Sequence, residues 1–259
     1  MMVSLEVVPR NQEALLSGVA HAGGFPQIQI INVPDLLRFP LRSWDACGIL
    51  AETPAISRFT YMPHLRARDF DPQKPFPHTA LFRARGITRV LVIAGDPPEG
   101  EDPAPPVPIQ QKARGYSTKT VSFIKKLKAE MPELQIYAAF DPYRSNIRYE
   151  LDYLRAKEDA GAVGFMSQPF FDLRLLEIFA EYLEGKQVFW GLSPVLSESS
   201  RNYWESRNRA VFPKNFRADL YWNVDFGRRV LRFCETQGFH LYLIPIKADV
   251  SAYLSGIFG

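Results

Sequence analysis

The chain has 259 residues, of which 46% are hydrophobic and 23% are charged, as in an ordinary globular protein. Its formal net charge of +3 is too small to indicate a nucleic-acid or membrane partner, and no apolar run approaches the roughly 20 residues of a membrane span. The two cysteines, Cys47 and Cys234, stand in unrelated contexts, which argues against a disulfide framework or a cysteine metal site.

The opening residues, MMVSLEVVPR, lack both a charged n-region and a long apolar core. We therefore expect no signal peptide and a cytoplasmic protein. A chain of this length holds either two small domains or one α/β barrel, so the order of its elements must decide between them.

Strand-like apolar runs and helix-like spacings alternate along the chain. Strands are predicted at residues 3–8, 27–33, 58–65, 90–94, 135–140, 163–167, 187–190 and 239–244. Helices are predicted at residues 11–21, 41–52, 78–85, 116–131, 145–159, 173–183, 197–209 and 225–237. This alternation predicts a single-domain (β/α)8 barrel, that is, a TIM barrel over residues 1–259. An open doubly wound sheet is the main alternative, but it needs a glycine-rich first turn, which Val8-Pro9-Arg10 does not provide.

One stretch places a carboxylate where a buried strand stops. Val90–Pro98 reads VLVIAGDPP, an apolar run that ends in Gly95, Asp96 and two prolines. The run fits a strand buried on both faces of a parallel sheet, although Asp-Pro is also typical of a plain turn. Gly95 has no side chain, so a flat group can approach the backbone there. The loop that follows, at residues 99–115, is long and proline-rich, and long loops in compact domains are often functional.

In a barrel all strands end at the same face, so the residues at those ends are expected to meet there. They are Glu6, Asn32 with Asp35, His64 with Arg66 and Arg68, Asp96, Asp141, Gln168 and Ser193. Carboxylates, amides and a histidine from separate strands predict a polar cavity suited to acid–base chemistry. No His/Cys cluster has metal-ligand spacing, so we expect no metal, and the sequence has neither a GxSxG turn nor a phosphate-binding loop.

Four motifs resemble those of methylenetetrahydrofolate reductases. SLEVVPR at residues 4–10 resembles the family's SFEFFPP opening, and MPHLRARD at residues 62–69 resembles its third-strand PHLTC segment. VIAGDPP at residues 92–98 resembles LRGDPP, and DAGAVGFMSQPFFD at residues 159–172 resembles DAGAD…TQFFFD. The motifs follow the family's order at similar spacing, over about residues 3–195.

This resemblance implies an FAD-containing barrel enzyme that reduces 5,10-methylene- to 5-methyltetrahydrofolate. Glu6 then corresponds to the general acid, Asp96 to the carboxylate that faces flavin and folate, and Gln168 to the amide that contacts the pterin. The positions that correspond to flavin contacts are His64, Gly95, Asp96, Tyr116, Ser117, Tyr137, Glu150 and Lys157.

The chemistry of this reaction agrees with two carboxylates in different states. Opening the imidazolidine ring requires a proton on the departing nitrogen, and a carboxyl group donates it if burial raises its pKa toward neutrality. The iminium that results is a cation, and a carboxylate about 4 Å away attracts it by about 4 kcal/mol at an effective dielectric of about 20, before desolvation. Flavin supplies the hydride, while the protein positions and polarises the reactants.

Several positions depart from the family pattern. Ala94 stands where the family has arginine, Asp141 where it has histidine, Glu150 where it has aspartate, and Pro169 replaces an aromatic residue. Losing a cation and gaining a carboxylate makes the diphosphate side of the site less positive, so weaker FAD binding is expected. Residues 197–217 have no counterpart in the resemblance, and we expect a divergent insertion near the barrel mouth.

Other functions remain open at this point. Two alternatives lie within the same class of enzyme: one that runs mainly as a 5-methyltetrahydrofolate oxidase, and one that reduces the folate directly with NADH and no flavin. A different class is a non-catalytic folate-binding or accessory barrel, although Glu6 and Asp96 argue against it because a binding protein needs no acid. A small-molecule folate is the expected partner; a homo-oligomer or an electron-donor protein is left open.

Overall fold

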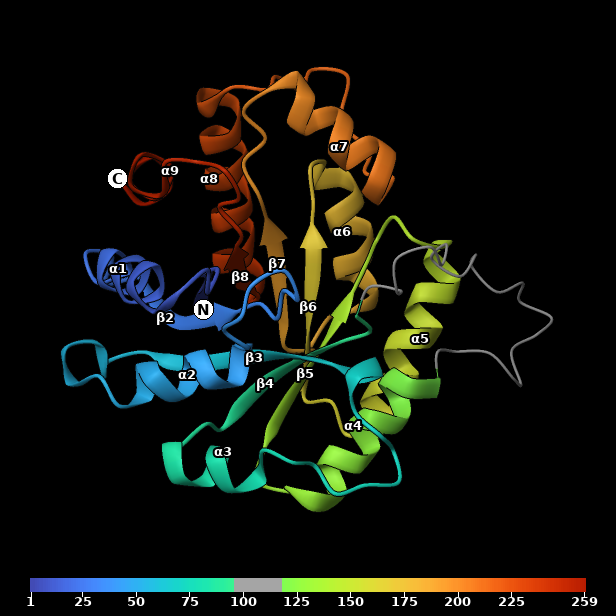
Figure 1. The fold of residues 1–259 in the computed structure, drawn as a ribbon. Coiled ribbons are helices and arrows are strands. Elements are labelled where there is room, and N and C mark those ends of the chain that lie inside the picture. The colour runs from blue at the N-terminus through green and yellow to red at the C-terminus, as the bar shows by residue number, and fades with distance from the viewer. Residues whose placement is uncertain (96–117) are drawn as a thin grey trace.

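The computed structural model describes residues 1–95 and 118–259 of the chain. Eight parallel strands close into a barrel in which each strand pairs with its neighbours in sequence and β8 pairs with β1. Helices surround the strands (Figure 1). The predicted single-domain TIM barrel is confirmed, and the open doubly wound sheet is excluded because the sheet has no edge strand.

The strands are β1 (Val3–Glu6), β2 (Ile28–Val33), β3 (Thr60–Arg66), β4 (Arg89–Ile93), β5 (Gln135–Phe140), β6 (Gly164–Pro169), β7 (Val188–Leu192) and β8 (His240–Leu243). The α-helices are α1 (Gln12–Ala22), α2 (Ser43–Ala51), α3 (Thr79–Arg85), α4 (Thr118–Glu130), α5 (Ile147–Asp159), α6 (Leu173–Tyr182), α7 (Glu198–Asn208), α8 (Leu220–Gln237) and α9 (Val250–Phe258). Two short 3₁₀ helices, η1 (Pro54–Ile56) and η2 (Ala67–Asp69), flank β3.

Alternation along the strands produces two separate apolar cores. Side chains such as Ile30, Met62, Leu91 and Phe189 point inward and fill the barrel. The residues between them point outward and form the larger core beneath the helices. Burial of each such side chain stabilises the fold by about 1.5–3 kcal/mol, so the two cores hold the strand ends in fixed positions.

The helix boundaries show two differences from the sequence prediction. Helix α8 begins at Leu220 rather than near residue 225, because the side chain of Asp219 accepts a hydrogen bond from the backbone N–H of Trp222 at 2.7 Å. Helix α9 was not predicted, and Asp249 caps it in the same way through the N–H of Ala252. An aspartate precedes and caps each of these two helices, and this signal is not part of the apolar spacing used to predict helices.

Residues 197–217 contain α7 and an aromatic cluster. Phe212 stacks on Phe171 with ring centroids 4.4 Å apart, and Phe216 contacts Trp222 on α8. This segment is therefore packed against α8 and the loop before α6. The proline-rich residues 99–115 lie outside the described part of the chain.

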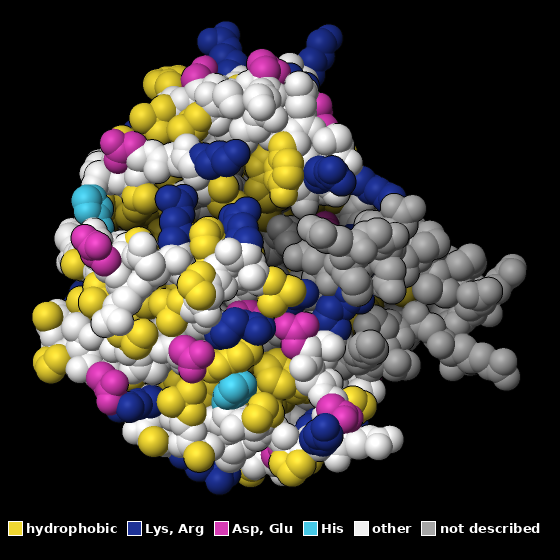
Figure 2. Space-filling view, viewed as in Figure 1, with side chains coloured by type: hydrophobic (Ala, Val, Ile, Leu, Met, Phe, Trp, Pro, Cys, Tyr) yellow, Lys and Arg dark blue, Asp and Glu magenta, His cyan; other side chains and the backbone are white. Residues whose placement is uncertain are grey.

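Basic and acidic side chains are interspersed on the face shown in Figure 2, as the small net charge predicts. Among the described residues, no helix is both long enough and apolar enough to cross a bilayer.

Candidate active site

Glu6 is the last residue of β1 and lies at the carboxyl end of the barrel, where its side chain keeps some exposure to solvent. The hydroxyl of Tyr242, from β8, donates a hydrogen bond to Glu6 Oε2. Burial raises the pKa of Glu6 to about 7, and the hydrogen bond from Tyr242 acts in the opposite direction. The carboxyl group therefore exchanges its proton near neutral pH, which suits a general acid or base.

Three buried polar atoms around Glu6 have no hydrogen-bond partner within the described residues. They are Asn32 Oδ1 on β2, His64 Nε2 on β3 and Ser193 Oγ after β7. Strand alternation places all three residues on the inward face of the barrel. Leaving such an atom unsatisfied costs about 1–3 kcal/mol, so their grouping at one end indicates groups that serve a ligand.

Asn32 and His64 are held by neighbours that fix their orientation. Asn32 pairs with Glu6 across the strands, and its Nδ2 donates to Ser4 Oγ. The backbone carbonyl of His64 accepts a hydrogen bond from Ser43 Oγ at 2.6 Å. Burial lowers the pKa of His64 to about 3, so its ring is neutral at physiological pH.

Gln168 lies in an irregularity near the carboxyl end of β6. Met166 pairs with Phe189 and Pro169 with Gly191, so β6 carries one extra residue between these two pairs. Gln168 is exposed there, and the neighbouring Ser167 Oγ accepts from the N–H of Gly191 at 2.7 Å. The bulge therefore presents the Gln168 amide at the mouth of the barrel.

Two arginines from the end of β3 pack against Gly95, which follows β4. Gly95 has a φ of +85°, a conformation that favours glycine, and a Cβ there would lie 2.9 Å from Arg68 Cγ and 3.0 Å from Arg66 Nε. Three predicted site residues, Asp96, Tyr116 and Ser117, lie outside the described residues. Arg66 and Arg68 therefore bring positive charge to the carboxyl end of β4, where this chain has Ala94 in place of the arginine of the family pattern.

An ion-pair network fixes Arg66. Arg66 Nε lies 3.4 Å from Asp69 Oδ2, and the same carboxylate pairs with Arg42 at 3.1 Å. Arg42 in turn pairs with the buried Asp35 at 2.5 Å. Asp35 Oδ1 also accepts from the N–H of Ser43 at the start of α2. Asp35, which we expected at the cavity, therefore binds Arg42 and α2.

Glu150 and Lys157 are buried residues of α5, and they lie beside Asp141, which is half-buried after β5. Lys157 Nζ donates to the carbonyl of Ala139 at 2.6 Å and lies 3.8 Å from the centre of the Tyr153 ring. The N–H of Asp141 donates to Glu150 Oε1 at 3.2 Å. Burial lowers the pKa of Lys157 to about 8 and raises that of Asp141 to about 6. The positions expected to contact flavin here are engaged with one another and with the backbone of β5.

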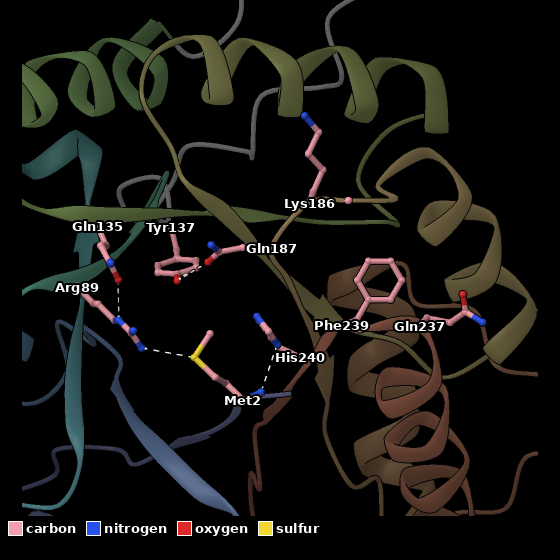
Figure 3. A pocket seen from close by; sticks show the side chains of 11 residues that line it. Met2, Arg89, Gln135, Tyr137, Lys186, Gln187, Gln237, Phe239 and His240 are labelled. Atoms are coloured by element: carbon pink, nitrogen blue, oxygen red, sulfur yellow. Dashed lines mark hydrogen bonds between the residues drawn. The ribbon is translucent and has the colours of Figure 1, made fainter.

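Tyr137 lies away from the mouth. Its ring packs inside the barrel against Phe189, and its hydroxyl donates to Gln187 Oε1 at 3.0 Å at the amino end of the strands (Figure 3). A Cβ at Gly164 would lie 2.9 Å from Tyr137 Cε1, so that glycine makes room for the ring. The structure does not bring Tyr137 together with Glu6, His64 and Gln168.

Sequence reasoning missed Tyr242, the partner of Glu6. The strand that contains it, HLYL, was predicted, and its alternation places Tyr242 on the inward face. What the sequence lacked was the register between β1 and β8, in which Ser4 pairs with Tyr242. The arrangement as a whole brings a protonatable carboxyl, a neutral imidazole and buried acceptor oxygens to the carboxyl end of the barrel.

Comparison with known families supports the resemblance seen in the motifs. The model of a family described as methylenetetrahydrofolate reductase matches residues 47–217, about two thirds of the chain. The matched range includes residues 197–217, which had no counterpart in the motifs, and it begins after Glu6. No curated protein matches the chain in sequence at a significant level.

Solved structures share the barrel at low sequence identity. An uncharacterized protein from Clostridium thermocellum, described as binding two copies of 5-methyl-5,6,7,8-tetrahydrofolic acid, has a TM-score of 0.64 at 11% identity; the match covers 99% of this chain and 93% of that one. A 2,3-dimethylmalate lyase has a TM-score of 0.60 at 10% identity, with 98% and 78% coverage. An oxaloacetate acetylhydrolase has a TM-score of 0.60 at 10% identity, with 98% and 79% coverage. At these identities the likeness shows the fold alone.

Proposed function

The chain belongs to the methylenetetrahydrofolate reductase family, and we propose that it is an FAD-dependent oxidoreductase that interconverts 5,10-methylenetetrahydrofolate and 5-methyltetrahydrofolate. The observation that carries this proposal is the Glu6 carboxyl, with a pKa of about 7, at the mouth of the barrel. The structurally similar protein described as binding 5-methyltetrahydrofolic acid supports a folate as the ligand.

Glu6 is proposed to donate the proton that opens the imidazolidine ring. Its protonated form is well populated near neutral pH, because burial raises its pKa to about 7. Once the proton has left, the Tyr242 hydroxyl donates to the new carboxylate and stabilises it. Reversal of the step returns the proton to Glu6, so the same residue serves both directions.

Two amides and one imidazole are proposed to orient the folate. Asn32 Oδ1 is a buried acceptor without a partner among the described residues, and pterin ring N–H groups are matching donors. Gln168, exposed in the β6 bulge, offers both a donor and an acceptor. His64 is neutral, so it hydrogen-bonds a ligand without adding a charge. Asp96 is proposed, from the resemblance alone, to stabilise the iminium cation.

The residues near Gly95 fit an anionic cofactor. Arg66 and Arg68 pack over Gly95 and supply positive charge beside β4, and the neutral His64 lies on the neighbouring strand. FAD, when bound, supplies the hydride. Arg66 and Arg68 would hold its anionic part, because guanidinium groups bind phosphate oxygens through paired hydrogen bonds.

A second candidate, a flavin-free reductase that takes its hydride directly from NADH, is favoured by one observation. Lys157, expected at the flavin, donates to the backbone of β5 and is buried, and Asp141 beside it is a carboxylate. Neither group offers a cation at the surface of the cavity.

Anaerobic single-turnover experiments with the purified protein test both candidates. We expect the isolated protein to show the visible absorption bands of a flavin. After reduction and mixing with 5,10-methylenetetrahydrofolate, flavin oxidation and 5-methyltetrahydrofolate formation should proceed at the same rate. Product formation from NADH by a flavin-free preparation would establish the second candidate instead. Folate binding without product under either condition would overturn both and leave a non-catalytic binding protein.

A further inference from the structure

A polar cavity lies at the end of the barrel opposite Glu6. Its volume is about 370 Å³, within the range of about 300–1,000 Å³ that small-molecule sites occupy. It is lined at the amino ends of the strands by Arg89, Gln135, Tyr137, Gln187 and His240, among others. Figure 3 shows these side chains turned toward a common centre.

Arg89 brings a charge to this cavity without a carboxylate beside it. Its Nε donates to Gln135 Oε1 at 2.8 Å, and its Nη1 lies 3.7 Å from the sulfur of Met2. Within residues 1–95 and 118–259, none of the ion pairs includes Arg89. A guanidinium has five N–H donors, and its two protein contacts are an amide oxygen and a weakly accepting thioether. Most of its hydrogen-bonding capacity therefore faces the cavity.

The neighbouring groups also present donors. The oxygen of Gln135 is taken by Arg89, and the oxygen of Gln187 accepts from the Tyr137 hydroxyl, so both amides have their NH₂ groups left. His240 Nδ1 accepts from the N–H of Met2 at 3.2 Å, which puts the proton of the neutral ring on Nε2. No carboxylate is among the residues that line the cavity.

The positive potential has an identifiable source. Lys186 also belongs to the lining, but its side chain extends away in Figure 3, and its Nζ pairs with Glu158 at 2.5 Å. Burial lowers the pKa of His240, a backbone hydrogen bond at Phe239 acts in the opposite direction, and the charges of the N-terminal amino group and of Arg89 lower it further. Arg89 is therefore a cation in the lining of the cavity, and the N-terminal amino group adds positive charge nearby.

We propose that this cavity binds a small oxyanion, a carboxylate or phosphate group, with the Arg89 guanidinium as its anchor. The planar fork of N–H donors matches two oxygens of either group, and the Gln135, Gln187 and His240 donors surround them. The site is independent of the folate chemistry proposed at the mouth, because it lies at the other end of the strands.

Histidine NMR titration of the folded protein, without folate or flavin, tests the proposal. The chain has four histidines, so the His240 ring signal is assignable with one substitution. Acetate and inorganic phosphate are the probes, and chloride at equal ionic strength is the comparison. We expect a saturable shift of the His240 signal and a rise in its pKa with acetate or phosphate, because a bound anion favours the imidazolium. The tighter of the two probes identifies which oxyanion the site takes.

Substitutions of Arg89 sharpen the result. Arg89→Gln should weaken binding about tenfold or more, and Arg89→Lys should weaken it less because the charge remains but the fork is lost. Arg207→Gln removes an exposed arginine from α7 and should leave the titration unchanged. Circular dichroism confirms folding, and if Arg89→Gln does not fold, the wild-type and Arg89→Lys titrations decide. An unmoved His240 signal, an equal effect of chloride, or undiminished binding by the Arg89 variants would overturn the proposal.

Discussion

The two ends of this barrel are both polar, but they offer opposite chemistry. The mouth, at the carboxyl ends of the strands, combines the protonatable carboxyl of Glu6 with three buried polar atoms: Asn32 Oδ1, His64 Nε2 and Ser193 Oγ. The opposite end, at the amino ends of the strands, presents the guanidinium of Arg89 among amide and imidazole donors. We propose that the first end exchanges a proton with a ligand and that the second binds a small oxyanion. Because the same strands supply both ends, the two ends differ in which side chains they carry and not in the length or alternation of the strands.

The largest expected effect tests the acid at the mouth. Glu6→Gln should reduce the rate of the folate half-reaction by about 10²–10⁴-fold, because an amide cannot donate the required proton. Rapid mixing of reduced protein with 5,10-methylenetetrahydrofolate measures this rate. Glu13→Gln removes an exposed carboxylate of α1 and should have no effect. A rate for Glu6→Gln close to that of the wild type would remove Glu6 from the mechanism.

The next effect concerns the cation at the mouth. Arg66→Gln should weaken FAD binding by roughly tenfold to a hundredfold, the value of one charge-assisted hydrogen bond. The loss should shrink at high salt, since salt screens the attraction. Fluorescence titration of the apoprotein at two ionic strengths measures both quantities. Unchanged affinity would show that Arg66 serves only the network with Asp69 and Arg42, and Arg207→Gln controls for loss of charge.

A smaller effect appears in the pH dependence of stability. The folded-state pKa values of Glu6, about 7, and Asp141, about 6, lie above their ordinary values of 4.5 and 3.8. Between the two sets of values these two groups hold more protons in the folded protein than in the unfolded chain, so their contribution to stability falls as pH rises from about 4 to 7, whereas the lowered pKa of His64 contributes in the opposite direction. Asp141→Asn, which keeps an acceptor for the N–H of Tyr143, should remove the Asp141 part of this pH dependence and add on the order of 1 kcal/mol of stability at pH 7.

Urea unfolding at several pH values measures that change, with the exposed Asp71→Asn as the matched control. An identical slope in the wild type and Asp141→Asn would mean that the Asp141 carboxyl is solvated in the folded protein.

The smallest effect is expected at the amino ends of the strands, opposite the mouth. Tyr137→Phe removes the hydrogen bond to Gln187 and should cost about 1 kcal/mol of stability, while FAD affinity and turnover stay within about twofold of wild type. Thermal unfolding and flavin titration check the two parts. A large loss of FAD affinity would place the flavin against Tyr137 and contradict the separation of the two ends.

The sequence supported the prediction of the strands and of most mouth residues for a physical reason. Several strands are short apolar runs with a polar residue at or near the carboxyl end, so Glu6, Asn32, His64 and Gln168 were placed at the mouth from local pattern. Features that depend on pairing between distant strands were not accessible: the Tyr242 bond needs the β1–β8 register.

The sequence also did not predict the Lys157 hydrogen bond or the position of the Tyr137 ring, for related reasons. The Lys157 bond to the Ala139 carbonyl needs the packing of α5 on β5. Tyr137 matched a motif position, but a motif does not specify toward which end of a barrel a ring will extend.

The hydrogen bond between Tyr242 and Glu6 joins residues 236 positions apart in the chain. Such a contact is of very high sequence separation, and the entropy of closing so long a loop must be overcome before the bond forms. During synthesis Tyr242 emerges 236 residues after Glu6, so Glu6 acquires its environment only when β8 docks on β1. Before that moment Glu6 is a solvated carboxylate with an ordinary pKa. The acid function proposed for Glu6 therefore depends on a late event of folding, and its appearance in a refolding experiment would time the closure of the barrel.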